Sequence, residues 1–113
     1  MASFFAPLTR TVPVDDQNTI TLRAPKYGEM QEVNSRAMVV RVGMDGEGAA
    51  TFDAGLLERL IFHMCITAWN GPGFDGLEPK PELIDQLPVW VLDKLKPAIN
   101  ELTKSMEDAE KKQ

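Results

Sequence analysis

The chain has 113 residues, a formal net charge of −5 and a single cysteine. A chain of this length is expected to form one domain, and no stretch of it approaches the roughly 20 apolar residues that a membrane span needs. Residues 42–113 carry thirteen Asp and Glu against seven Lys and Arg, a net of −6. This acidity argues against nucleic-acid binding, which requires clustered basic residues. The lone Cys65 excludes an internal disulfide and, with an N-terminus that lacks a signal-peptide pattern, favours the cytoplasm.

Residues 9–25 predict a β-hairpin. Two runs of alternating apolar and polar residues, rich in β-branched side chains, flank the turn-forming residues Asp-Asp-Gln-Asn. Pro13 lies inside the first run and confines it to the edge of a sheet, because proline cannot donate to a β-ladder. Residues 25–41 then predict a helix that begins near Pro25, with apolar residues at intervals of three and four.

The next two segments are a loop and an apolar run. Residues 42–53 contain three glycines and an Asp-Gly pair, which indicate a loop or a small hairpin turn. Residues 54–69 are apolar on nearly every side, as is typical of a central buried helix. The last five of them, "CITAW", are equally compatible with a strand, and periodicity does not decide between the two.

The C-terminal part predicts a connector followed by helices. Residues 68–88 hold three glycines and four prolines around Trp69, and 81–88 within them predict a short helix. From residue 89 onward, apolar residues recur alternately three and four apart. They form a narrow seam, which we call the 92–109 seam: Leu92, Leu95, Ile99, Leu102, Met106 and Ala109. Pro97 falls on the opposite, outward side of this predicted helix.

Together these elements predict an α+β fold in which an N-terminal β-hairpin or small antiparallel sheet packs on about four helices, with a long amphipathic C-terminal helix. We expect one domain over residues 1–105 and a charged, fraying tail over 106–113.

Candidate catalytic and metal-binding residues are sparse. His63 and Cys65 are the only residues of their kinds, and two positions apart on a helix they point in different directions, which suits neither a nucleophile–base pair nor a zinc cluster. We therefore expect a core thiol beside a histidine at the helix edge. The acidic residues at 44–48 lack calcium-loop spacing and predict a solvated turn. No catalytic set emerges, so we expect a protein that is not an enzyme and needs no cofactor or metal.

The order of motifs is more informative than any one of them. The N-terminal "TRTVPVDDQNTITLRAPKYGEMQEV" and the central "ITAWNGPGFDGLEPKPELIDQLP" resemble passages of the tail assembly chaperones of long-tailed, siphovirus-type bacteriophages and prophages. The resemblance covers about residues 9–105. It implies a non-catalytic protein that binds the tape measure protein during tail assembly, in the cytoplasm of the infected or lysogenic bacterial host, and is not retained in the finished virion.

The narrow seam predicts where such a partner would bind. A helix with an apolar stripe suits docking along another helix, and an exposed Trp at its start would add a typical hot-spot residue. The predicted partner-binding residues share this helix: Trp90, Leu92, Leu95, Ile99, Leu102 and Met106. The tape measure protein is the expected partner, the major tail protein is a further candidate, and pairing of the seam with itself into a homo-oligomer is left open.

Two alternatives to the chaperone remain open on the sequence. The chain could be a minor structural or completion protein of the phage tail, which would stay in the virion. A small enzyme using acidic residues of the 70–80 loop is disfavoured, because no nucleophile or base accompanies them. Trp69 is expected to anchor the core rather than a site.

Overall fold

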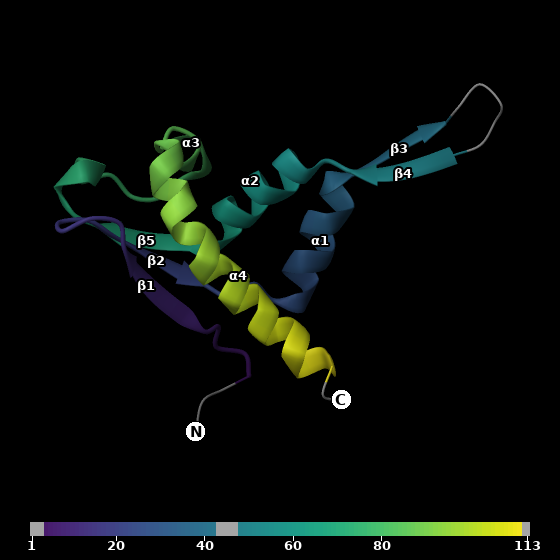
Figure 1. The fold of residues 1–113 in the computed structure, drawn as a ribbon, viewed down its shortest axis with the longest axis horizontal. Coiled ribbons are helices and arrows are strands. Elements are labelled where there is room, and N and C mark those ends of the chain that lie inside the picture. The colour runs from purple at the N-terminus through teal and green to yellow at the C-terminus, as the bar shows by residue number, and fades with distance from the viewer. Residues whose placement is uncertain (1–3, 43–47, 112–113) are drawn as a thin grey trace.

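A computed structural model describes the backbone of residues 4–42 and 48–111, and the side chains of these residues except 39–42, 48–50, 52 and 104–111. It has the predicted α+β architecture (Figure 1). The elements in chain order are β1 (Thr9–Pro13), β2 (Thr19–Arg23), α1 (Tyr27–Ala37), β3 (Met38–Val42), β4 (Gly48–Phe52), α2 (Ala54–Cys65), β5 (Ile66–Asn70), η1 (Pro72–Phe74), α3 (Pro81–Ile84) and α4 (Val89–Lys111).

The main sheet is antiparallel, with strand order β1-β2-β5. The predicted hairpin is confirmed: β1 and β2 pair so that Thr11 lies opposite Thr21. Pro13 is on an edge strand, as its missing N–H requires. On β2, Ile20 and Leu22 are completely buried and the alternate threonines are half-buried, so one face of the sheet meets the core.

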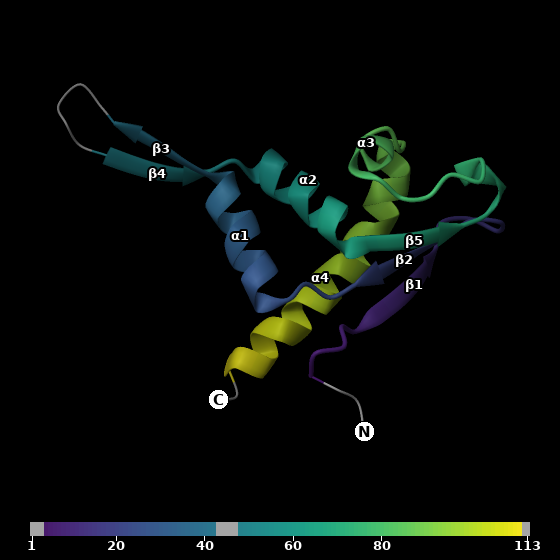
Figure 2. The same cartoon turned by 180° about the vertical axis from the view of Figure 1, so that it is seen from behind.

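A second, two-stranded sheet departs from the prediction. The helix expected over residues 25–41 ends at Ala37, and the chain continues as β3, which pairs with β4. Val39, Val40 and Val42 explain the change, because β-branched side chains are restricted in helices and favoured in strands. This ribbon projects away from the rest of the molecule (Figures 1 and 2). The turn predicted at 44–48 falls mostly on residues 43–47, outside the described part.

The apolar run at 54–69 divides into a helix and a strand. Asp53 caps the start of α2 by accepting a hydrogen bond from the Leu56 N–H at 3.0 Å. The helix ends at Cys65, and the chain then pairs with β2 as β5. The strand alternative for the end of this run is therefore correct, and the buried helix is shorter than the whole run.

The buried face of the last helix has the predicted register, but it is broader than the predicted seam. In α4 the side chains of Leu95, Ile99 and Leu102 are buried, and so are those of Val91 and Ala98. These five positions form a broad core-facing stripe instead of a narrow seam. Pro97 is exposed, as expected. The helix runs to Lys111, whereas a fraying tail was expected from residue 106. The short helix predicted over residues 81–88 is limited to α3.

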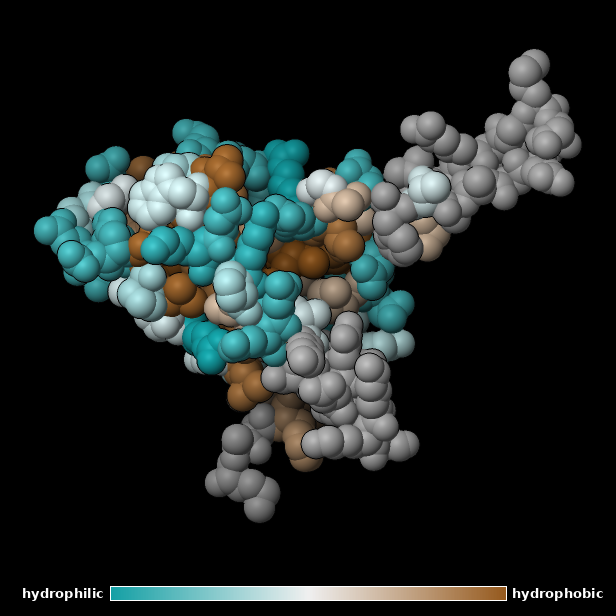
Figure 3. Space-filling model, in the orientation of Figure 1, coloured by the Kyte–Doolittle hydropathy of each residue, from teal (hydrophilic) through white to brown (hydrophobic). Residues whose placement is uncertain are grey.

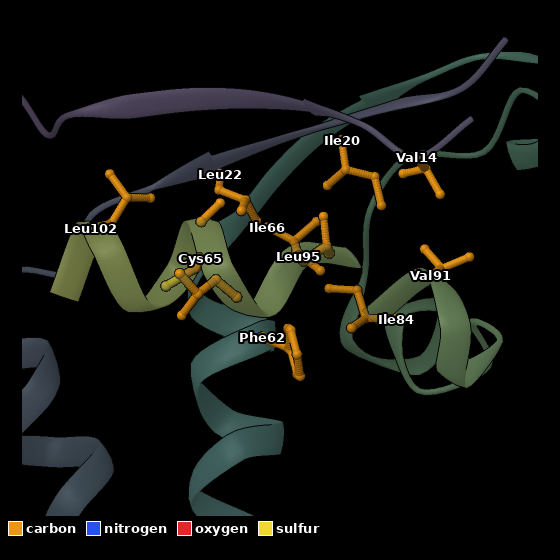
Figure 4. Close-up of a cluster of buried hydrophobic side chains, with 12 residues drawn as sticks. Val14, Ile20, Leu22, Phe62, Cys65, Ile66, Ile84, Val91, Leu95 and Leu102 are labelled. Carbon is orange, nitrogen blue, oxygen red and sulfur yellow. The ribbon is translucent and has the colours of Figure 1, made fainter. Parts of the chain in front are cut away.

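The core lies where α4 crosses the inner face of the sheet, with α2 and α3 on its other sides (Figure 4). Its completely buried members come from three different parts of the chain: Ile20, Leu22, Cys65 and Leu95. The radius of gyration is 16.6 Å, larger than the ~13 Å of a compact domain of this length. The projecting β3–β4 ribbon and the long α4 account for the difference.

Candidate functional site

Most of the predicted partner-binding seam is occupied by the chain's own core. Leu95, Ile99 and Leu102 are 0%, 7% and 8% exposed, and Leu92 is half-buried against the same cluster. The expectation that this face is left open for a partner is therefore wrong. The physical reason is that β2 supplies an apolar surface of its own, which α4 covers. The side chain of Met106 lies outside the described residues.

Trp90 is the predicted residue that reaches the surface. It is 51% exposed and follows Val89, which is 73% exposed, at the start of α4. The core stripe begins one residue later, at Val91. Trp90 thus remains a predicted partner contact. The seam that follows it along α4 points into the core.

A different apolar surface lies between α2 and α4. Figure 3 shows hydrophobic atoms gathered in the space between α4 and α1, over α2. A hollow of about 340 Å³ opens there, with half-buried Leu57 and Ile61 on one side and Ile99 on the other. Its lining residues come from the two helices: Ala54, Leu57, Glu58, Ile61, Phe62, Lys96, Ile99 and Asn100. Leu57 and Ile61 are one helical turn apart, so they form a short apolar ridge.

A second hollow of about 390 Å³ shares Glu58 and Phe62 with the first and reaches Ile84 in α3. The two hollows adjoin at these shared residues on α2, and we call them together the α2–α4 groove. The groove was not predicted from the sequence, although the apolar run over α2 contains a signal for it. Residues 54–69 are apolar on more sides than one covering surface can bury.

Charged side chains bridge the groove near its middle. The Lys96 ammonium lies 3.1 Å from the Asp93 carboxylate, and 3.6 Å from that of Glu58 across the groove. A hydrogen bond with Asp93 and the charge of Glu58 raise the pKa of Lys96. All three residues are about half exposed, so the rim is charged while the floor is apolar.

An ion cluster joins α2 to the end of α3. Asp85 accepts two hydrogen bonds from Arg59, at 3.0 and 2.6 Å, and its carboxylate lies 2.6 Å from His63 Nε2. These contacts, first that of Arg59 and then that of His63, lower the pKa of Asp85 to about 2. His63 is therefore held at the edge of the helix, as predicted.

Cys65 lies in the core, where burial raises its pKa to about 11. A thiol with such a pKa is protonated at neutral pH and is a poor nucleophile. His63, by contrast, contacts Asp85 at the edge of α2. Among the described residues, no group of three or more His, Cys, Asp or Glu side chains is placed to hold a metal ion.

The two sequence passages that carry the family resemblance meet in space. Asn18, in the turn before β2, accepts a hydrogen bond from the Gly73 N–H at 2.8 Å. Asp15 fixes this turn by accepting from the Gln17 and Asn18 N–H groups at 2.9 and 2.8 Å. The motifs thus build one corner of the fold together, which gives both of them a structural role.

Trp69 anchors this corner, as predicted. Its ring stacks on Phe74 with centroids 4.6 Å apart, and its indole N–H donates to the Leu77 carbonyl at 2.5 Å. The side chain is half-buried and packs against the core. These contacts make the 68–88 stretch a folded connector, in agreement with the sequence-based interpretation.

Comparisons with models of known protein families, with curated proteins and with solved structures found no match. Within the described residues, every helix is too short or too polar to cross a membrane.

Proposed function

We propose that the chain is a non-catalytic tail assembly chaperone that binds a helical segment of the phage tape measure protein. The motif resemblance at residues 9–33 and 66–88 suggests the family. The observation that carries the binding proposal is the α2–α4 groove, which combines an apolar floor with a charged rim. Grooves of this kind accept one face of an amphipathic helix.

The groove replaces the 92–109 seam as the proposed contact surface. Leu57 and Ile61 would meet apolar residues spaced three and four apart on the partner helix, as in helix packing generally. Glu58 and Lys96 carry opposite charges at the rim and would favour one orientation of a partner with charges beside its apolar stripe. Trp90, exposed at the start of α4, is retained as a further proposed contact.

Two substitutions test the groove without entering the core. Leu57→Lys places a charge on the half-buried ridge, and Asn100→Trp fills the hollow from an exposed position that lines it. We expect each to weaken binding of the co-produced tape measure protein at least tenfold, which corresponds to about 1.4 kcal/mol. Isothermal titration calorimetry and co-purification measure the effect.

Tyr27→Ser is the matched control, because Tyr27 is 63% exposed on α1 and lies outside the residues that line the groove. Circular dichroism and melting temperature establish that each variant is folded. Wild-type affinity in both groove variants would refute the groove as the contact surface. Absence of binding by the wild-type chain itself would refute the chaperone proposal.

The proposal also predicts where the chain acts. A chaperone works in the host cytoplasm and leaves before the tail is complete, whereas a minor structural or completion protein stays. Mass spectrometry of purified virions separates the two functions. Stoichiometric recovery of the chain from virions would favour the structural alternative.

A further inference from the structure

The charges along the α2–α4 groove do not balance. Within the described residues, the charged side chains that line its two hollows are Glu58, Arg59, Asp85 and Lys96. Arg59 and Asp85 form an ion pair through two hydrogen bonds at the end of α3, so they neutralise each other. The net charge of the groove therefore depends on the ions around Lys96.

One ammonium group serves two carboxylates there. Lys96 Nζ lies 3.1 Å from Asp93 Oδ1 on its own helix and 3.6 Å from Glu58 Oε1 on the facing helix. In the part of the chain that the structure describes, neither carboxylate has a further ion pair. Two negative charges thus share one positive charge, and one negative charge is left uncompensated.

The two contacts of Lys96 differ in strength. The contact with Asp93 joins residues three positions apart in α4, which the helix itself brings together, and its length is that of a hydrogen bond. The contact with Glu58 crosses between two helices and is too long for a hydrogen bond. A cation that approaches from outside would therefore displace Lys96 from Glu58 more easily than from Asp93.

Glu58 lies where a partner in the groove would meet it. Its side chain lines both hollows and is 54% exposed. The apolar ridge runs beside it, since Leu57 precedes Glu58 and Ile61 follows almost one turn later. A helix that packs its apolar stripe on this ridge would bring the side chains flanking that stripe close to the Glu58 carboxylate.

The charge of the surrounding chain acts in the same direction. Residues 42–113, which include both helices of the groove, carry a net charge of −6. A field of this sign attracts a basic segment and repels an acidic one. The occupant that complements the groove is therefore apolar on one face and basic beside it.

We propose that the helix bound in the α2–α4 groove carries an arginine or lysine beside its apolar stripe, and that this side chain pairs with Glu58 in place of Lys96. Lys96 then keeps Asp93, so two carboxylates face two cations. An acidic side chain at the same place would face both carboxylates, which excludes partners of that kind. The inference rests on the proposed function, because it specifies the partner of the same groove.

Peptides test the partner's side of this contact. Overlapping peptides that cover the tape measure protein are screened for binding to the full chain. We expect the bound peptides to carry Arg or Lys beside apolar residues spaced three and four apart. Replacing that basic residue by Glu should weaken binding to the wild-type chain and have a smaller effect on binding to Glu58→Gln.

Two substitutions with opposite expected effects test the chain's side. Glu58→Gln removes the carboxylate that the partner's cation would meet, and Lys96→Gln removes the competing ammonium. We expect Glu58→Gln to weaken binding of the tightest peptide roughly three- to fivefold, as for a partly exposed ion pair, and Lys96→Gln to strengthen it. In isothermal titration calorimetry, the affinity of Glu58→Gln should also depend less on ionic strength than that of wild type.

Two matched controls carry the same changes of charge outside the groove. Glu32→Gln, exposed on α1, matches Glu58→Gln, and Lys94→Gln, exposed on α4, matches Lys96→Gln. Neither Glu32 nor Lys94 lines the hollows. Both controls should bind like wild type, because a change of net charge alone does not alter the contact at Glu58.

Several results would overturn the inference and leave the groove in place. They are bound peptides without a basic residue, an unchanged affinity of Glu58→Gln, and a Lys96→Gln variant that binds more weakly than wild type. Binding of the intact tape measure protein but of none of its peptides would do the same. In each case Leu57→Lys would still weaken binding of the intact protein. If the wild-type chain binds neither the peptides nor the intact protein, the proposed function fails as well.

Discussion

At residue 71 the backbone has a φ of +135°, a conformation that side chains other than glycine rarely adopt. A Cβ added there would also lie 2.5 Å from the Gln17 carbonyl and closer still to the Asn18 side chain. We expect Gly71→Ala to lower the free energy of unfolding by at least ~1–3 kcal/mol, measured by urea denaturation. Gly28→Ala is the control, because a Cβ at that helical position meets nothing within 4 Å. A loss no larger in Gly71→Ala than in Gly28→Ala would contradict the close packing of the two motifs.

Glu29 gives the stability of the chain a pH dependence. Hydrogen bonds from Arg23, at 2.7 and 2.5 Å, lower its pKa from 4.5 to about 2. Because the pKa is depressed in the folded state, the stabilisation is present above about pH 4.5 and is lost as the pH falls towards 2. Glu29→Gln should therefore show a shallower loss of unfolding free energy than wild type across this range. Glu32→Gln, on the same helix, controls for the loss of one charge, and identical curves for wild type and Glu29→Gln would contradict the assignment.

At the scale of single elements, α4 is a core helix. Leu95 is 0% exposed and faces Ile20 and Leu22 across the core (Figure 4). We expect Leu95→Ala to lower the free energy of unfolding by ~2–5 kcal/mol, the usual cost of such a cavity. Val89→Ala, at a 73% exposed position of the same helix, should change it by less than ~0.5 kcal/mol. Equal effects of the two substitutions in urea denaturation would contradict the burial of this face.

Elements with local signals were predicted well. The β1–β2 hairpin follows from its turn residues and alternation, and Pro13 marks the edge without reference to the rest of the fold. The strand β5 could not be decided from its own residues, because its partner is β2, over 40 residues earlier in the chain. For α4, the predicted seam residues Leu95, Ile99 and Leu102 are buried, but Val91 and Ala98, which are also buried, were left out of the prediction. Helical periodicity within α4 does not reveal the sheet that buries Val91 and Ala98.

At the scale of the whole molecule, the extents of 56 × 37 × 19 Å describe a flat body. The groove could not be located from the sequence, because residues 54–62 and 96–100 are brought together by tertiary packing. The two passages that resemble tail assembly chaperones were noted from the sequence, and the structure adds their mutual contact through Asn18 and Gly73.

The position of α4 in the chain also sets the order in which the protein can fold. Synthesis proceeds from the N-terminus, and five core residues belong to this last helix: Val91, Leu95, Ala98, Ile99 and Leu102. While the ribosome is still translating, Ile20 and Leu22 therefore lack the helix that covers them, and the core closes after residue 102 has emerged. A protein proposed to be a chaperone thus passes, each time it is made, through an interval in which its own sheet is not yet covered by α4.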